Sequence, residues 1–397
     1  MTVSRGATEI AQSVIRRRNL SRMLNELHRR GPLTRSELAL SLRVNRSTVA
    51  SLIAELAARD LVSERYRDKP EVQPTPGRPS PVVEICRDGP TALALELSTD
   101  WIRAAVIGLG AWVAVSVRRD LPLASSTPGQ ALDEMHEIVA PMLKGLVRGP
   151  RVVAIGVSVP GAVRAQDGHV YDAPNLGWHD VPLGSLVRRR FHELGVSVFV
   201  GNDADLATSA EQLRGSGHGA ADFICLWGEG GEESLLRRSG RDPLGGTRAL
   251  ADLLSAADRG DTVALAALSE SGRWLGIGLA GLVNVFNPTR ISLGGLYARI
   301  FPYVNEAVLR ELDSRAMPAP RAMVELTTAL LGANTLLLGA AELALAPTLY
   351  GPTIVPLRDV PFGSIPTDDG LDGSPALVNP FRGPCKEVFW QDSLGLD

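Results

Sequence analysis

The stretch TRSELALSLRVNRSTVASLIAEL, residues 34–56, predicts two short helices separated by a tight break at residues 43–45. Thr34 and Glu37 have the spacing of a capping box, in which a hydroxyl and a carboxylate satisfy free backbone amides at a helix start. The apolar side expected for this first helix consists of Leu38, Leu40 and Leu42. Two helices joined so closely are typical of a helix-turn-helix.

The second helix of this pair is expected to start near Ser47 and to present a polar cluster at its N-terminal end. Its predicted buried face consists of Val49, Leu52, Ile53 and Leu56. In a helix-turn-helix, the second helix enters the major groove of DNA and its first residues contact base edges. We therefore predict four DNA-binding residues here: Arg46, Ser47, Thr48 and Ser51. A purely structural bundle of three helices is the alternative.

The sequence on either side extends this pair into a winged helix-turn-helix. Upstream, residues 19–30 have an apolar stripe at helical spacing, and Gly31-Pro32 ends that predicted helix. Downstream, residues 61–65 and 82–85 predict the two strands of a wing. We expect this domain to span residues 15–88.

A proline-rich segment, PTPGRPSP at residues 74–81, joins the two predicted strands. Within it, Gly77-Arg78-Pro79 presents one guanidinium on a stiff, extended backbone. Such an arm suits a narrow minor groove, where the negative potential of DNA is strongest. Arg78 is therefore the fifth predicted DNA-binding residue. A plain proline-rich linker is the alternative interpretation.

Charge divides the chain into a basic and an acidic part. Residues 1–90 carry 16 Lys and Arg against 10 Asp and Glu, whereas the other residues carry 25 against 34. A basic part of this kind favours a polyanionic partner. The 3 cysteines lie far apart, which argues against a disulfide framework. No apolar run is long enough for a membrane span, so we expect no membrane association and a cytoplasmic protein.

Residues 91–346 predict an α/β body with two lobes. Strands are expected at residues 91–97, 102–109, 112–118, 152–159 and 196–200, with a helix at 129–147. A meander of strands followed by alternating strands and helices fits a ribonuclease-H-like core.

Four segments of this body, in this order behind a helix-turn-helix, resemble the transcriptional regulators of the ROK family (repressors, open reading frames, kinases). They are GVSVPG at 156–161, APNLGW at 173–178, NDA at 202–204, and NP at 287–288 followed by ISLGG at 291–295. The resemblance covers about residues 15–346 and implies an actin/hexokinase-like fold.

By this resemblance, Asn202 and Asp203 lie where ROK kinases hold the sugar, and Asp203 corresponds to the general base of the kinases. A carboxylate at the end of a strand can also accept a hydrogen bond from a sugar hydroxyl without any reaction. We predict both residues as sugar-binding. The alternative is that Asp203 merely caps a helix at residues 206–214.

The first strand of the family's kinases leads into a loop of the type Asp-x-Gly-Gly-Thr, whose glycines bring backbone amides close to phosphate. The corresponding stretch here is ELSTD, residues 96–100, which has no glycine and an additional carboxylate. We therefore predict no catalytic residue, no cofactor and no enzymatic activity. An ATP-dependent sugar kinase that uses Asp203 as its base is the alternative function.

A second departure from the family lies at residues 228–236, GEGGEESLL. The resemblance implies a Glu-x-Gly-His pair and a Cys-x-Cys-Gly-x-x-Gly-Cys cluster at this point, and this chain has neither. Zinc needs about four nitrogen or sulfur ligands, so we predict no metal site. The family's Glu and His also contact sugar, which leaves Glu229, Glu232 and Glu233 as candidates for a replacement contact.

These features together predict a sequence-specific DNA-binding transcriptional regulator, a repressor of carbohydrate uptake or metabolism genes. We expect a homodimer or homotetramer on an inverted repeat of double-stranded DNA, because two half-sites multiply the modest affinity of one. A sugar or sugar phosphate is the expected effector, and a regulator locked in one state by the missing segment is a further alternative. Residues 351–397 hold 7 Pro and 6 Gly and are expected to form a disordered tail.

Overall fold

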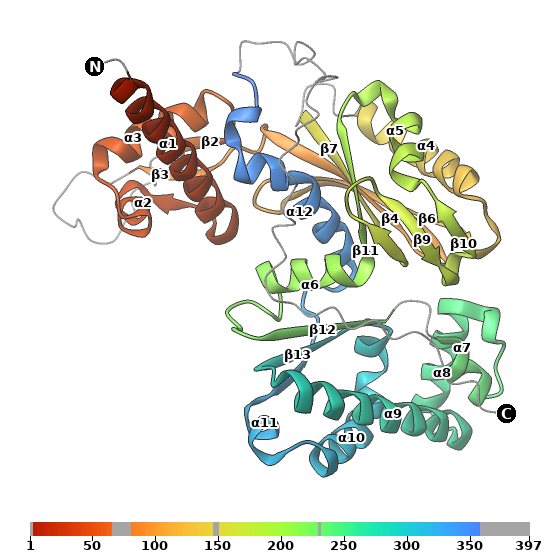
Figure 1. Cartoon of the computed structure of the whole chain (residues 1–397). Helices are drawn as coiled ribbons and strands as arrows, with labels where there is room; N and C mark the ends of the chain where they lie inside the picture. The colour runs from red at the N-terminus through yellow and green to blue at the C-terminus, as the bar shows by residue number, and fades with distance from the viewer. Residues whose placement is uncertain (1–2, 66–80, 146–150, 229–231, 358–397) are drawn as a thin grey trace, which may run out of the picture.

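Three parts follow one another along the chain (Figure 1): a head at residues 3–85, lobe 1 at residues 90–202 and lobe 2 at residues 223–328. Helix α6, Asp203–Arg214, lies between the lobes, and helix α12, Thr335–Tyr350, returns to lobe 1. The computed structural model describes residues 3–65, 81–145, 151–228 and 232–357.

The head combines three helices with a small antiparallel sheet. Its elements are α1 Val3–Arg30, β1 Leu33–Thr34, α2 Arg35–Leu42, α3 Arg46–Ala57, β2 Val62–Arg65 and β3 Val82–Ile85. Thr34 and Glu37 form the predicted capping box, and the side chain of Asn45 caps α3. Strand β3 pairs with both β1 and β2, so the two predicted wing strands are neighbours. Helix α1 starts well before residue 19, where the apolar stripe begins.

The prediction that Leu40 belongs to the apolar side of α2 is wrong. Leu38 and Leu42 are buried one turn apart, whereas Leu40 is 81% exposed. Because each residue of a helix rotates the side chain by about 100°, Leu40 faces away from its two neighbours. The buried face of α3 is as predicted and consists of Val49, Leu52, Ile53 and Leu56.

Lobe 1 is built on a five-stranded sheet of order β11-β7-β4-β5-β6. Its strands are β4 Pro90–Leu97, β5 Trp101–Gly108, β6 Val113–Asp120, β7 Arg151–Val159 and β11 Ser197–Asn202. The pairings of β7 with β4 and β11 are parallel, and those of β5 with β4 and β6 are antiparallel. A smaller antiparallel sheet consists of β8 Ala162–Arg164, β9 His169–Ala173 and β10 Trp178–Val181.

Helices cover both faces of the large sheet. Because side chains alternate along a strand, Ala92 and Ala94 of β4 pack in the same core as α12, while Leu93 and Leu95 pack with the other helices. Those helices are α4 Pro128–Lys144 and α5 Leu183–Arg190. The core that contains α12 continues into the head, whose buried leucines belong to the same cluster.

Lobe 2 holds a parallel three-stranded sheet of order β12-β13-β14 and its own core. Its strands are β12 Phe223–Gly228, β13 Arg290–Gly295 and β14 Glu325–Thr328. Its helices are α7 Glu232–Arg238, α8 Gly246–Asp258, α9 Thr262–Phe286, α10 Leu296–Arg315 and α11 Pro318–Met323.

Two close approaches fix α12 in place. A side chain at Gly156 of β7 would overlap the backbone carbonyl of Ala340, and one at Gly339 would overlap the carbonyl of Leu206 in α6. Helix α12 is therefore clamped between the large sheet and α6. Just after it, Pro352–Ile354 form a 3-10 turn and Val355 is buried.

Three sequence predictions fall on residues that the structure does not describe. Arg78 and Glu229 lie outside the described residues, and so does the predicted tail beyond residue 357. No helix in the part of the chain that is described combines the length and apolar character needed to cross a membrane.

Candidate functional site

The N-terminal end of α3 presents the predicted polar cluster at the surface. Arg46, Ser47 and Ser51 are exposed and Thr48 is half-buried. The Asn45 side chain accepts hydrogen bonds from the Thr48 amide and from the Ser47 hydroxyl, each at 2.8 Å. The bond from Thr48 satisfies one free amide of the first turn and caps the end of α3. The structure thus brings these four residues together on one helix end.

Helix α1 contributes a residue to this surface that sequence analysis missed. Arg16 lies against the exposed side of α3, where its Nε donates to Glu55 Oε2 at 2.7 Å and its Nη2 donates to Ser51 Oγ at 3.0 Å. The hydroxyl of Ser51 therefore already has a protein partner. The run Arg16-Arg17-Arg18 was the available signal, but the apolar stripe that predicted α1 begins only at Leu20.

Positive charge at this end of the head is only partly neutralised. Among the described residues, neither Arg43 nor Arg46 has a carboxylate within ion-pair distance. Beside the wing, in contrast, Arg35 pairs with Glu64 at 2.6 Å and Arg65 with Glu84 at 2.7 Å. Uncompensated guanidinium groups beside a rigid helix end are suited to contact phosphate or guanine.

The predicted sugar-binding pair lies where strand β11 leads into α6. Asn202 caps α6 through its side-chain oxygen, which accepts from the amides of Ala204 at 2.9 Å and Asp205 at 3.2 Å. Its Nδ2 donates to the carbonyl of Gly161 at 2.9 Å. The side chain that caps α6 is therefore that of Asn202. Asp203 is 8% exposed, and its Oδ1 accepts from the Ala204 amide.

The stretch at residues 96–100, where the phosphate loop of the kinases is expected from the sequence, makes contacts within the chain. Glu96 is buried at the end of β4, where it accepts from Trp101 Nε1 at 2.9 Å and pairs with Arg103 at 3.3 Å. Burial raises the pKa of the Glu96 carboxyl, and the charge of Arg103 opposes this effect only in part. Arg103 also donates to the backbone of Ala333.

Asp100 in the same stretch bridges the two lobes. Its Oδ2 accepts from the Thr247 amide at 3.0 Å and from the Thr247 hydroxyl at 2.8 Å, at the first turn of α8. Gly246, with φ of +51°, lies so close that a side chain there would overlap the Asp100 carboxyl group. A carboxylate therefore satisfies the free amide of α8 across the boundary between the lobes.

The part of the chain that the structure describes holds no group of three or more metal-ligating side chains close enough to bind an ion. Burial raises the pKa of the Cys225 thiol to about 12, which keeps it protonated at neutral pH. His218 contacts the carbonyl of Leu213 at 3.2 Å. These residues give no support to a zinc site, and the absence of one remains a prediction.

The resemblance found in the sequence is confirmed by comparison with known proteins. Residues 93–231 and 232–346 match the model of the ROK family. The chain belongs to the ROK family. Its sequence is 23% identical over 382 residues to a xylose repressor of Bacillus spizizenii, a match that covers 84% of this chain and 96% of that protein. It is 22% identical over 253 residues to a glucokinase of Halalkalibacterium halodurans, covering 48% of this chain and 76% of that enzyme.

One solved structure gives the same result for the fold. The crystal structure of a ROK family transcriptional regulator, a homologue of the E. coli MLC protein, superposes with a TM-score of 0.65 at 19% sequence identity. The superposition covers 85% of this chain and 97% of that one. The α/β body predicted from sequence is therefore the fold of this ROK chain.

Proposed function

We propose that this ROK protein is a sequence-specific DNA-binding repressor of sugar-metabolism genes. The observation that carries the proposal is the extent of the matches. Similarity to the xylose repressor covers 84% of the chain, whereas similarity to the glucokinase covers 48%. The family model matches only residues 93–346. The similarity to the regulators therefore includes residues outside the part of the chain that the kinases share.

In this proposal, the head is a winged helix-turn-helix domain over residues 15–88. The ROK body follows over residues 91–346. Helices α2 and α3 meet at a tight turn, and Arg43 at that turn adopts the left-handed conformation with φ of +56°. Strands β2 and β3 form the wing. In this arrangement α3 is the recognition helix, and Arg46 at its exposed end contacts guanine or phosphate.

The protein binds its operator as a homodimer or homotetramer. Operators of helix-turn-helix proteins contain two half-sites about one helical turn apart, so a symmetric oligomer places two heads on an inverted repeat. One head alone gives modest affinity, and linking two raises it by orders of magnitude.

The effector is a sugar or sugar phosphate that binds beside Asn202 and Asp203. Asp203 is buried at the boundary between the lobes, where a carboxylate oxygen can accept from a sugar hydroxyl. The effector changes DNA binding only if it binds one arrangement of the lobes better than another. The protein does not transfer phosphate, because Asp100 already caps α8 at the expected phosphate loop.

Selection of bound fragments from genomic DNA of the source organism tests the proposal directly. At near-physiological salt, non-specific phosphate binding weakens and base readout remains. We expect enrichment of a few fragments that share an inverted repeat. Uniform recovery of fragments would contradict the proposal.

The enriched fragment then tests the recognition helix. Replacing Arg46 by Ala is expected to weaken binding about tenfold or more, since a good contact to a base contributes about 1–3 kcal/mol. Arg29→Ala is the matched control, because Arg29 is an exposed arginine of the same head on α1. Equal affinity of wild-type protein and the Arg46 variant would show that α3 does not read DNA.

Calorimetry tests the effector and the kinase alternative together. D-xylose, D-glucose and N-acetylglucosamine are titrated into the protein with and without ATP. Binding heat that is lost in Asp203→Asn but kept in Asp205→Asn, an exposed aspartate on the same turn, would support the sugar site. Release of ADP that depends on both sugar and Asp203 would instead establish the kinase.

A further inference from the structure

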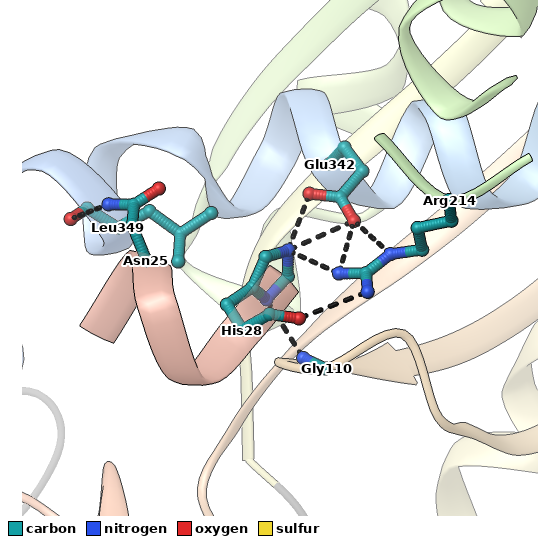
Figure 2. Close-up of polar contacts among 6 residues, drawn as sticks. All are labelled: Asn25, His28, Gly110, Arg214, Glu342 and Leu349. Carbon is teal, nitrogen blue, oxygen red and sulfur yellow. Dashed lines mark hydrogen bonds and ion pairs between the residues drawn. The ribbon is translucent and has the colours of Figure 1, made fainter. Parts of the chain in front are cut away.

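The contact between the head and the body is centred on a buried group of three polar side chains (Figure 2). His28 of α1 lies with its Nε2 at 2.8 Å from Glu342 Oε2 of α12. Arg214, the last residue of α6, donates from Nε to Glu342 Oε1 at 3.0 Å and from Nη1 to the backbone carbonyl of His28 at 3.0 Å. Three helices that are far apart in sequence therefore meet at one point.

His28 also has a backbone partner in lobe 1. The amide of Gly110, in the turn between β5 and β6, donates to His28 Nδ1 at 2.8 Å. His28 Nε2 lies at 2.6 Å from Arg214 Nη2 as well as beside Glu342, so both ring nitrogens have partners. His28 is thus an oriented link between α1 and α12.

The group holds an ion pair despite its burial. His28 and Glu342 are 2% and 4% exposed. Burial alone would raise the pKa of the Glu342 carboxyl, but His28 and Arg214 outweigh that effect and lower the pKa to about 2. Glu342 is therefore ionised at neutral pH, and Arg214 is its charged partner. Removing Arg214 would leave a buried charge without compensation.

The opposite end of α6 lies at the predicted effector site. Asn202 caps α6 and Asp203 is its first residue, whereas Arg214 at the far end contacts the head. At about 1.5 Å per residue, the helix spans about 17 Å between these two ends. Side by side with α12 and in contact with β12, α6 touches both lobes as well as the head.

Further contacts hold α6 at Glu211 in its last turn and at Leu206 near its start. The buried carboxylate of Glu211 accepts from the amides of Ser216 at 2.7 Å, Leu331 at 2.9 Å and Leu330 at 3.1 Å. The close approach of Gly339 to Leu206 prevents α6 from moving away from α12 without loss of packing. Helix α6 is therefore expected to respond as one body to a displacement at either end.

We propose that α6 couples the effector site to the DNA-binding head, and that Arg214 is the positioning residue that transmits the displacement of α6 to α1 through His28 and Glu342. The inference rests on the proposed function for the roles of the two sites. The coupling between the ends of α6 is a property of the fold and can be measured without DNA or sugar.

The test is a double-mutant cycle on the full chain, followed by hydrogen exchange of the amides in residues 19–30 of α1. Asn202→Ala removes the cap at the effector end of α6. Arg214→Lys keeps the charge at the head end but loses the planar fork that binds Glu342 and the His28 carbonyl together. Asp261→Ala is the matched control, because Asp261 caps α9 in lobe 2 in the same way, with a bond of 2.8 Å to the Ala264 amide.

If α6 couples its two ends, Asn202→Ala should accelerate exchange in α1 about fivefold when Arg214 is present, and much less in the Arg214→Lys background. Asp261→Ala should leave exchange in α1 unchanged. Equal acceleration in both backgrounds, or none in either, would overturn the coupling. If Arg214 has a merely structural role, Arg214→Lys should accelerate exchange in α1 by the same factor in the wild type and in the Asn202→Ala variant.

A second pair of variants covers the case in which Arg214→Lys does not fold. Replacing Arg214 by Met and Glu342 by Gln together removes both buried charges and leaves none uncompensated. The same loss of response to Asn202→Ala is expected in this background, and a retained response would overturn the coupling.

Affinity for the selected DNA fragments separates this inference from the proposed function. Non-additive exchange without selection of any fragment would leave the coupling intact and contradict the DNA-binding role. Selection of an inverted repeat together with additive exchange would support the DNA-binding role and refute the coupling.

Discussion

The head and lobe 2 are joined to lobe 1 in different ways. The head shares a continuous apolar core with α12 and adds the buried group of His28, Arg214 and Glu342. Lobe 2 has a separate core. Polar contacts join it to lobe 1: Asp100 accepts from Thr247, and Arg103 donates to Asn334 in the segment before α12. The head is therefore attached as part of lobe 1, and lobe 2 is the part that can shift at lower cost.

Two buried carboxyl groups, Glu342 at the head junction and Glu96 within lobe 1, respond to burial in opposite ways. Glu342 has two strong donors and a lowered pKa, whereas Glu96 has a weaker contact with Arg103 and a raised pKa. The difference shows that burial disfavours a carboxylate until enough charged donors surround it. Glu96, with its raised pKa, lies closer to its neutral form than Glu342 and contributes less to stability at neutral pH.

The largest effect is expected from Glu342→Gln. This change leaves the partly buried Arg214 without its charged partner, and the free energy of unfolding should fall by about 4 kcal/mol. Urea unfolding at neutral pH measures the loss. Glu306→Gln is the control, because the pair of Glu306 with Arg310 lies at the surface, and it should change stability by less than about 0.5 kcal/mol. Equal losses would mean that the head junction is no stronger than a surface pair.

Acid should change the contributions of Glu342 and Glu96 to stability in opposite directions. The ordinary pKa of Glu is 4.5, so the stabilisation from Glu342 is present above pH 4.5 and is lost as the pH falls towards 2. The loss amounts to about 3 kcal/mol. The raised pKa of Glu96 makes its contribution complete below pH 4.5 and lost as the pH rises.

Urea midpoints across this pH range, compared between wild type, Glu342→Gln and Glu96→Gln, measure the two contributions. The Glu342 variant should flatten the acid side of the stability profile, and the Glu96 variant should flatten the slope at higher pH. Identical profiles for the two variants would contradict the assignment.

A smaller loss is expected where α12 crosses α6. Gly339→Ala places a methyl group against the carbonyl of Leu206, which should cost about 2 kcal/mol. Gly278→Ala on α9 is the matched control, because nothing lies within 4 Å of its new methyl group. There the better helix propensity of Ala should stabilise the protein by up to about 1 kcal/mol. Thermal unfolding of the two variants should therefore shift in opposite directions.

The smallest effect is expected at the boundary between the lobes. Asp100→Ala removes two hydrogen bonds to Thr247 in a partly exposed position and should cost about 1 kcal/mol. Limited proteolysis near residues 98–100 and 246–247 should rise, while urea unfolding changes little. A loss as large as that for Glu342→Gln would show that lobe 2 is held as tightly as the head.

Local patterns predicted the elements of the head well, because caps and apolar spacing act over a few residues. Thr34, Glu37 and the buried face of α3 are examples. The prediction that Leu40 is buried was wrong because residues two positions apart in a helix lie on nearly opposite sides. The same spacing would have been correct for a strand.

The site could be predicted only where its residues are neighbours in sequence. The predicted residues at the end of α3 lie within two turns, and Asn202 and Asp203 are adjacent, so the sequence alone places the members of each set together. His28 lies 186 residues from Arg214 and 314 from Glu342, so no periodicity connects them. Arg16 likewise reaches Ser51 across 35 residues, a contact that depends on how α1 crosses α3.

Helix α1 has 28 residues, so a small rotation near its C-terminal end produces a larger displacement near its N-terminal end. His28 near one end is the pivot, and Arg16, about 18 Å away along the axis, lies beside the surface of α3. A rotation of about 6° about the pivot would carry Arg16 through about 2 Å, which is enough to break a hydrogen bond. Small angular changes at the junction are thus magnified at the far end of the head.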